Sequence, residues 1–146
     1  MTQSDSRNDP IGAFRFEVAI DDMPVAGFSE CNGLQLELEV HDYHEGGMNA
    51  VMRKFPGHAK QTNITLKRGI VDRSLWDWFY AATQGEITLR SGSIVVYDPS
   101  GATEELKWTF ERAFPAKLVG PELNATQNSV AVETLELCHE GLKRPI

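Results

Sequence analysis

The chain has 146 residues, of which 41% are hydrophobic and 24% charged, which suits a single globular domain with a substantial core. Its formal net charge of -7 argues against a nucleic-acid backbone as partner, because the phosphates would be repelled. The sequence holds no run of about 18 apolar residues and no apolar segment near its start, so we expect neither a transmembrane helix nor a secretory signal.

The first third of the chain predicts a polar arm followed by three strands. Residues 1–9 are polar and predict a flexible N-terminal arm. Apolar and polar side chains then alternate, and turn residues separate the runs, which predicts strands at residues 14–20, 25–28 and 34–40. The alternation is strict in the third strand, so we expect one of its faces in a core and the other, with Glu37 and Glu39, in water.

A long polar segment and a helix occupy the middle of the chain. Residues 42–59 show no apolar periodicity and predict a long loop, after which residues 62–67 predict a strand. Residues 72–84 predict the one helix, with Asp72 as its N-cap and Gly85 at its C-terminal end. The inward stripe of this helix consists of Leu75, Trp78, Phe79 and Ala82, which leaves Trp76 facing outward.

The last third predicts short strands separated by turns. They fall at residues 86–90, 93–97, 106–113 and 130–139, with Phe114-Pro115 ending the third of them and both faces of the last one covered. Seven or eight short strands and a single helix predict a β-barrel or sandwich with one helix packed on it. Strands and helices do not alternate, which argues against a doubly wound nucleotide-binding fold.

Residues that could carry chemistry do not form a known pattern. His41 and His44 lie three apart, but a divalent metal needs three or four converging ligands, and only His58 and His139 remain to complete a set. Solvated loop histidines are the simpler interpretation. The two cysteines match no metal spacing, and there is no nucleophile elbow or phosphate-binding loop. We therefore predict no catalytic, cofactor or metal site.

Short motifs in order along the chain resemble a known family. The sequence is similar to the inner tube proteins of contractile injection systems and the tail tube proteins of contractile-tailed phages, from about residue 9 to residue 144. The motifs are Phe14-Arg15-Phe16-Glu17-Val18, Val25-Ala26-Gly27-Phe28-Ser29-Glu30, Asn32-Gly33-Leu34, Glu45-Gly46-Gly47, Arg53-Lys54-Phe55-Pro56-Gly57, Asn63-Ile64-Thr65-Leu66-Lys67-Arg68-Gly69, Leu75-Trp76-Asp77-Trp78, Pro115-Ala116-Lys117, Gly120-Pro121 and Leu135-Glu136-Leu137-Cys138-His139-Glu140-Gly141-Leu142.

This resemblance implies a structural role. It implies a single domain over residues 1–146 that is mainly β: a barrel of two packed antiparallel sheets with one flanking helix and a long extended loop. Such proteins form hexameric rings that stack into a hollow tube. A contractile sheath drives that tube, and its other partners are baseplate and spike proteins and cargo in the lumen. They contact nucleic acid only in a phage tail, and they assemble in the cytoplasm without a signal peptide, as part of a particle that some systems release.

The resemblance also suggests which residues make contacts. In the family a loop corresponding to residues 42–59 takes part in ring stacking. We therefore expect contacts between subunits or rings from Glu45, Gly46, Gly47, Arg53, Lys54, Phe55, Pro56 and Gly57. Trp76 is the candidate for a contact on the outer surface.

Several alternatives stay open from the sequence. Within the same class they are a tube-initiating paralogue at the baseplate, a phage tail tube protein and the tube protein of type VI secretion. From a different class they are a small β-barrel enzyme or ligand-binding module.

Overall fold

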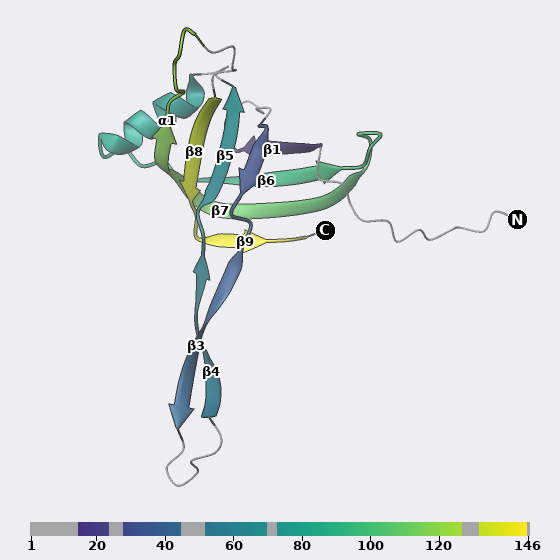
Figure 1. Ribbon diagram of the computed structural model, residues 1–146, viewed down its shortest axis with the longest axis vertical. Helices are drawn as coiled ribbons and strands as arrows, with labels where there is room; N and C mark the ends of the chain where they lie inside the picture. The colour runs from purple at the N-terminus through teal and green to yellow at the C-terminus, as the bar shows by residue number, and fades with distance from the viewer. Residues whose placement is uncertain (1–14, 24–27, 45–51, 70–72, 127–131, 146) are drawn as a thin grey trace, which may run out of the picture.

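The computed structural model describes residues 15–23, 28–44, 52–69, 73–126 and 132–145. Its described residues form a mainly β body with one helix, from which a long two-stranded hairpin projects (Figure 1). The elements are β1 (Phe16–Ile20), β2 (Glu30–Asn32), β3 (Leu36–His44), β4 (Met52–Gln61), β5 (Ile64–Gly69), α1 (Ser74–Thr83), β6 (Arg90–Tyr97), β7 (Glu104–Val119), β8 (Val132–Cys138) and β9 (Gly141–Lys143).

Two antiparallel sheets form the body, and they share strand β7. One sheet runs β1-β6-β7, with β9 also paired to β7, and the other runs β7-β8-β5-β2. The shared strand changes sheets near Arg112, whose φ of 52° is unusual for a residue other than glycine. The predicted fold class, with antiparallel sheets and one helix, is confirmed.

Strand β7 corrects the predicted break at Phe114-Pro115. The strand passes straight through both residues, because its register against β8 shifts between Pro115 and Lys117. A bulge of this kind tolerates a residue that has no backbone N–H to donate. Proline therefore marks the irregular part of a long strand here and not its end.

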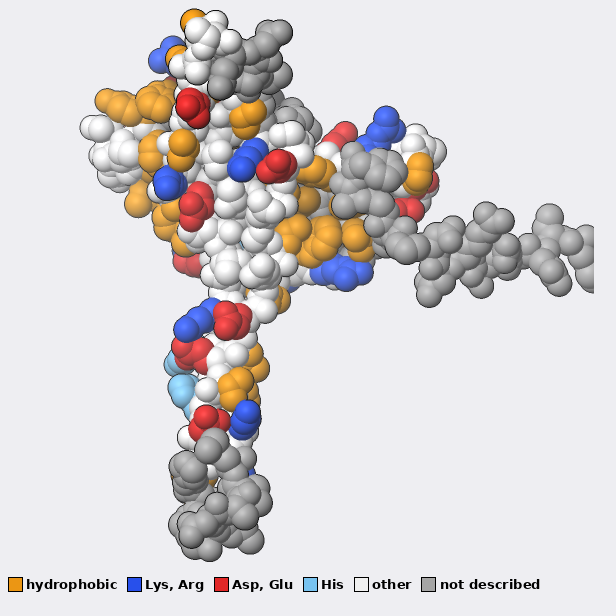
Figure 2. Space-filling model, viewed as in Figure 1, with side chains coloured by type: hydrophobic (Ala, Val, Ile, Leu, Met, Phe, Trp, Pro, Cys, Tyr) orange, Lys and Arg blue, Asp and Glu red, His pale blue; other side chains and the backbone are white. Residues whose placement is uncertain are grey.

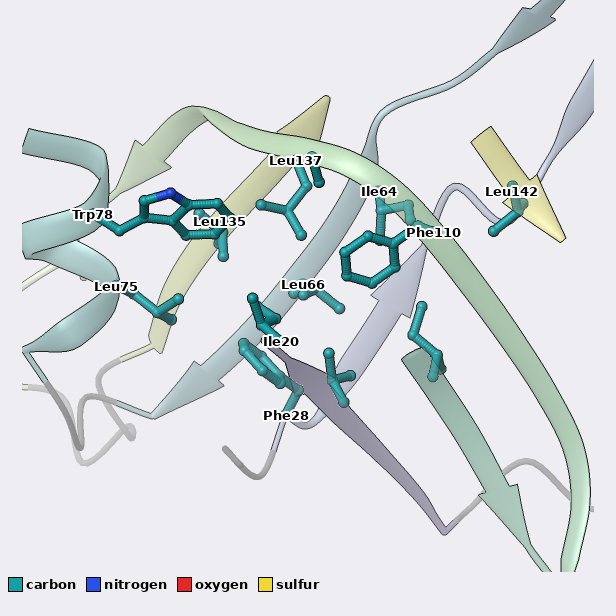
Figure 3. Close-up of a cluster of buried hydrophobic side chains, with 13 residues drawn as sticks. Ile20, Phe28, Ile64, Leu66, Leu75, Trp78, Phe110, Leu135, Leu137 and Leu142 are labelled. Carbon is teal, nitrogen blue, oxygen red and sulfur yellow. The ribbon is translucent and has the colours of Figure 1, made fainter. Parts of the chain in front are cut away.

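The core lies between the two sheets and is closed at one side by α1. Its fully buried side chains come from both sheets, and Leu75 and Trp78 from α1 point into the same cluster (Figure 3). The largest of them are Phe110, Ile64, Leu66, Ile94, Leu135, Leu137 and Val18. The indole N–H of Trp78 donates to the carbonyl oxygen of Thr88 at 2.9 Å, which ties the helix to the segment that follows it.

The helix confirms its prediction within a residue or two. It spans Ser74–Thr83, and Gly85 after it has a φ of 88°, as a C-terminal cap requires. The expected N-cap, Asp72, lies outside the described residues. Phe79 and Ala82 are half-buried and Trp76 is exposed, as the predicted stripe requires.

Other strand predictions need correction. Residues 86–89 are not a strand; strand β6 (Arg90–Tyr97) covers the predicted strand 93–97 and only the last residue of the predicted strand 86–90. Strand β2 is an element that the sequence did not predict. Of the predicted strand 25–28, Phe28 is buried but belongs to no strand, and residues 25–27 lie outside the described residues. Strand β8 is not the last one, because β9 follows it; one face of β8 is buried and the other half-buried.

The predicted loop 42–59 is wrong in its described part. Strands β3 and β4 pair antiparallel from Leu36↔Gln61 to His44↔Met52 and form what we call the hairpin. It extends away from the body (Figure 1), so no core imposes an apolar period on its outer half. The segment is therefore extended and paired although its sequence looks irregular.

Candidate assembly surfaces

The hairpin carries an exposed apolar face. Residues that are partners across an antiparallel pair point to the same side, so Leu38 lies beside Ala59 and Val40 beside Pro56. A register shift between Leu38 and Val40 keeps these pairs on one face, because β4 has one extra residue there. We call this face the apolar strip; it consists of Leu36, Leu38, Val40, Pro56 and Ala59.

The strip contradicts the expected burial of strand 34–40. Leu36, Leu38 and Val40 are 62%, 53% and 61% exposed, and of the predicted apolar face only Leu34 packs against the core. Figure 2 shows hydrophobic side chains along one side of the hairpin. A continuous apolar strip of this kind on a monomer marks an interaction surface.

The opposite face of the hairpin satisfies its own polar groups. The ammonium of Lys60 lies 2.7 Å from a carboxylate oxygen of Glu39, and the His41 ring lies 3.8 Å from the same carboxylate. Tyr43 and Phe55 meet edge to face with ring centroids 5.6 Å apart. The two faces are therefore chemically different, and the polar one is stabilised within the chain.

The predicted contact residues lie partly on this hairpin. Arg53, Lys54, Phe55, Pro56 and Gly57 all belong to β4, and the first four lie in its outer half. They alternate between the two faces, so that Lys54 is the partner of Asp42 and Arg53 of Tyr43. The predicted contacts of Glu45, Gly46 and Gly47 lie outside the described residues.

Sequence reasoning missed the residues of the strip. The signal was present, since Leu34, Leu36, Leu38 and Val40 alternate strictly. The error was to assign that alternation to this subunit's own core.

Hydrogen bonds fix the base of the hairpin to the body. The Thr62 hydroxyl donates to the carbonyl oxygen of Gly33 at 3.1 Å, and the Gln61 amide donates to that of Glu140 at 3.2 Å. The buried ring of His139 places Nε2 3.1 Å from the carbonyl oxygen of Thr62, so this nitrogen carries the proton and donates. These contacts set the direction in which the hairpin leaves the body.

Gly33 is required at this base. Its φ of 91° is in the left-handed region, and a Cβ there would overlap the carbonyl oxygen of Asn63. Asn63 is itself held by a hydrogen bond of 2.8 Å from its side-chain amide to Glu136. The chain can therefore turn into the hairpin only with a residue that lacks a side chain.

The outer face of α1 is a second apolar surface. Trp76 and Tyr80 lie one turn apart and are both about half exposed, and an ion pair of 3.4 Å joins Arg73 to Asp77 beside them. Figure 2 shows hydrophobic side chains gathered at the helix end of the body. The expected outward direction of Trp76 is confirmed; its contact stays a prediction.

The sheets also have open edges. Among the described strands, β1 pairs only with β6 and β2 pairs only with β5. Each of these two strands therefore leaves one side of its backbone without a strand partner in the described chain, and such an edge accepts a strand from another chain.

Two titratable groups of the described residues have a shifted pKa with a plain structural cause. Burial raises the pKa of the Cys31 thiol to about 11, which disfavours the reactive thiolate. The hydroxyl of Ser100 lowers the pKa of Asp98, which is structural because Asp98 also accepts backbone N–H groups of the 98–103 turn. Within the described ranges no cluster of three His, Cys, Asp or Glu side chains could hold a metal, and no helix could span a membrane.

The comparison with protein families decides the identity of this fold. The family described as T4-like virus tail tube protein gp19 matches residues 12–143. The chain belongs to this family. A comparison with curated protein sequences gave no match.

Solved structures similar to this tail tube protein include chains from contractile injection systems. A chain in the sheath–tube complex of the extracellular contractile injection system PVC, in its extended state, is 27% identical with a TM-score of 0.86 and covers 98% of both chains. A chain in the sheath/tube terminator of PVC is 26% identical with a TM-score of 0.88, covering 97% of this chain and all of the other.

More distant structures share the fold alone. Hcp1 from Flavobacterium johnsoniae is 9% identical with a TM-score of 0.57, and the match covers 89% of this chain and 94% of Hcp1.

Proposed function

We propose that this tail tube protein is the main inner tube subunit of a contractile injection system, in which hexameric rings stack into a hollow tube that a sheath propels. One observation carries the proposal. A chain of a sheath–tube complex matches over nearly its whole length. In agreement with that match, the fold exposes three large aliphatic side chains at alternate positions on a projecting hairpin. Aliphatic side chains in this arrangement lose contact with water only if another subunit covers them.

In this proposal each surface has its own task. The open edges of β1 and β2 would join neighbours within a ring, because an edge strand pairs with a strand of the next chain. The hairpin would cross to the next subunit or ring through its strip, with Arg53 and Lys54 adding polar contacts. In this proposal the other partners of the tube are the sheath, the baseplate and spike proteins, and cargo in the lumen. The tube would be assembled in the cytoplasm.

The outer face of α1 would meet the sheath. Trp76 and Tyr80 supply the exposed aromatic area that is enriched at interface centres. Trp76→Ala should then leave rings and tubes intact and weaken retention of purified sheath protein on tubes. Equal retention by Trp76→Ala and wild-type tubes would remove Trp76 from this contact.

A second candidate function is that of a terminator or initiator subunit at the end of the tube. The match to a chain of the sheath/tube terminator is as good as the match to the sheath–tube complex. A terminator or initiator is present in few copies, whereas the main tube protein outnumbers it greatly. Counting copies per particle by quantitative mass spectrometry separates the two functions.

Electron microscopy of a shortened hairpin tests the main proposal. Glu37 and Lys60 are partners across the hairpin, so a two-residue Asn-Gly turn can replace residues 38–59. The described part of this segment contributes nothing to the core cluster, so the body should fold as before. We expect rings or tubes from the wild type and neither from the shortened chain. A wild-type protein that stays monomeric at high concentration, with sheath and baseplate present, would refute the proposal.

A further inference from the structure

The body has two opposite poles, and the hairpin leaves from only one of them. In the sheet β7-β8-β5-β2, the pair Ile64↔Leu137 lies at the end near the hairpin. The pairs Gly69↔Val132 and Val119↔Thr134 lie at the far end. The segment that follows Val119 therefore lies at the pole away from the hairpin, as Figure 1 shows. We call the described residues 120–126 the pole loop.

The pole loop presents one leucine to solvent. Leu123 is 82% exposed, the largest exposed fraction among the large hydrophobic residues of the described chain. Directly after it, the Asn124 side chain accepts hydrogen bonds from the Thr126 backbone N–H at 3.0 Å and hydroxyl at 2.7 Å. This local turn shapes the loop behind Leu123. At this exposure most of the Leu123 side chain is covered by no other residue of the described chain.

An apolar pocket lies between the segment that enters the hairpin, at Leu34, and strands β1, β2, β6 and β7 of the body. It has a volume of about 140 Å³, close to that of an engineered apolar cavity of about 150 Å³ that takes up benzene. The residues around it are Phe16, Cys31, Leu34, Ile94, Val96 and Trp108. Leu34 lines the pocket and lies two residues before Leu36, the first residue of the apolar strip. The pocket and the strip are therefore neighbours along the chain. Figure 2 shows hydrophobic side chains in the corner between the body and the hairpin.

We propose that Leu123 of a subunit in one ring inserts into this pocket of a subunit in the next ring. The inference rests on the proposed function, because it specifies how stacked rings meet. Rings that stack head to tail use two different surfaces, which must complement each other. One pole offers a projecting leucine, and an apolar pocket of about 140 Å³ reaches Leu34 at the start of the hairpin.

The charges beside the two surfaces also match. Glu122, next to Leu123, is an exposed carboxylate. At the pocket, the guanidinium of Arg144 lies 6.0 Å from the ring centre of Trp108. Opposite charges beside an apolar contact favour this register over its alternatives.

Disulfide trapping tests the contact, because Cys31 lines the pocket. In a Cys138→Ser background, Leu123→Cys would place its thiol beside Cys31 of the next ring, within the distance of about 7 Å between Cα atoms that a disulfide needs. Ala125→Cys, two residues further along the same exposed loop, is the matched control. The assembled tubes are oxidised in air with copper phenanthroline at pH 9, which offsets the raised pKa of Cys31, and are analysed on a non-reducing gel.

We expect cross-linked dimers from stacked tubes with Leu123→Cys, several-fold fewer with Ala125→Cys, and none from isolated rings. A second variant, Leu123→Asp, should keep a folded subunit and raise the protein concentration needed for stacking about tenfold or more, since one buried leucine is lost at each contact.

Four results would overturn the inference. Equal cross-linking in isolated rings would place the contact within a ring. Absence of dimers in stacked tubes, with Leu123→Asp stacking like the wild type, would refute the contact and leave the tube function standing. Protection of Cys31 from a maleimide in monomers, lost when residues 1–13 are removed, would show that the chain's own N-terminal segment fills the pocket. If the wild type forms no rings at all, the proposed function fails and this contact fails with it.

Discussion

Replacing one leucine of the apolar strip should weaken assembly without affecting the fold. Leu38→Ser removes an aliphatic side chain that is 53% exposed, so about half of its surface remains to be covered by another subunit. Full burial of a leucine contributes roughly 1.5–3 kcal/mol, which gives on the order of 1 kcal/mol for the remaining half. A contact weakened by about 1 kcal/mol loses about fivefold in affinity. If six such contacts join two rings, they lose roughly 6 kcal/mol together.

The assay is the protein concentration at which tubes appear, measured by sedimentation and negative-stain microscopy. Glu37→Ser is the matched control, because it places the same side chain one residue away on the polar face of the hairpin. Both positions are exposed, so both variants should unfold in urea within about 0.5 kcal/mol of the wild type. We expect Leu38→Ser to remain as rings or monomers where Glu37→Ser forms tubes. Equal assembly of the two variants would show that the strip stays in water in the tube, and the argument from exposure would fall.

Three further predictions concern the subunit itself. Phe110→Ala should lower the free energy of unfolding by about 3–5 kcal/mol in urea titrations, because this ring is fully buried between the two sheets; a loss below about 1 kcal/mol would contradict the described core. Gly33→Ala should cost about 1–3 kcal/mol through its left-handed φ and the overlap with Asn63, whereas Gly120→Ala, with open space around it, should cost far less; equal losses would refute the requirement at the hairpin base. In unassembled Cys138→Ser protein, maleimide labelling of Cys31 should speed up about tenfold per pH unit until about pH 11, whereas the urea-unfolded chain should level off near pH 9; a folded-state plateau near pH 9 would contradict the burial of this thiol. Since the folded pKa is the raised one, the stability linked to Cys31 is present below pH 9 and is lost as the pH rises toward 11.

Local patterns predicted the elements that pack against this subunit's own core. The helix was found because Leu75 and Trp78 recur at helical spacing and are buried, and because Gly85 supplies the backbone conformation that ends it. Strands β1 and β5 were found for the same reason, since every second side chain enters the core. In these elements local preference and tertiary burial agree.

The sequence was less informative where the partner lies elsewhere. In the hairpin the alternation of Leu36, Leu38 and Val40 is real, but the surface that would cover it is not part of this subunit. The outer half of the hairpin is held by cross-strand pairs such as Tyr43 with Phe55, which depend on a register that no single window of sequence reveals. The passage of β7 through Pro115 depends likewise on a bulge set by β8.

The sharing of β7 has a mechanical consequence. Two sheets that meet only through side chains can slide past each other under load, because dispersion contacts offer little resistance to shear. Here one continuous strand of 16 residues pairs with β6 and β9 along its first part and with β8 along its last part, so a force that enters one sheet passes to the other along covalent backbone. Separating the sheets would require stripping β7 from its hydrogen-bonded neighbours on one side or the other. If the tube is driven endwise by a sheath, as we propose, the subunit gains stiffness from that single unbroken strand.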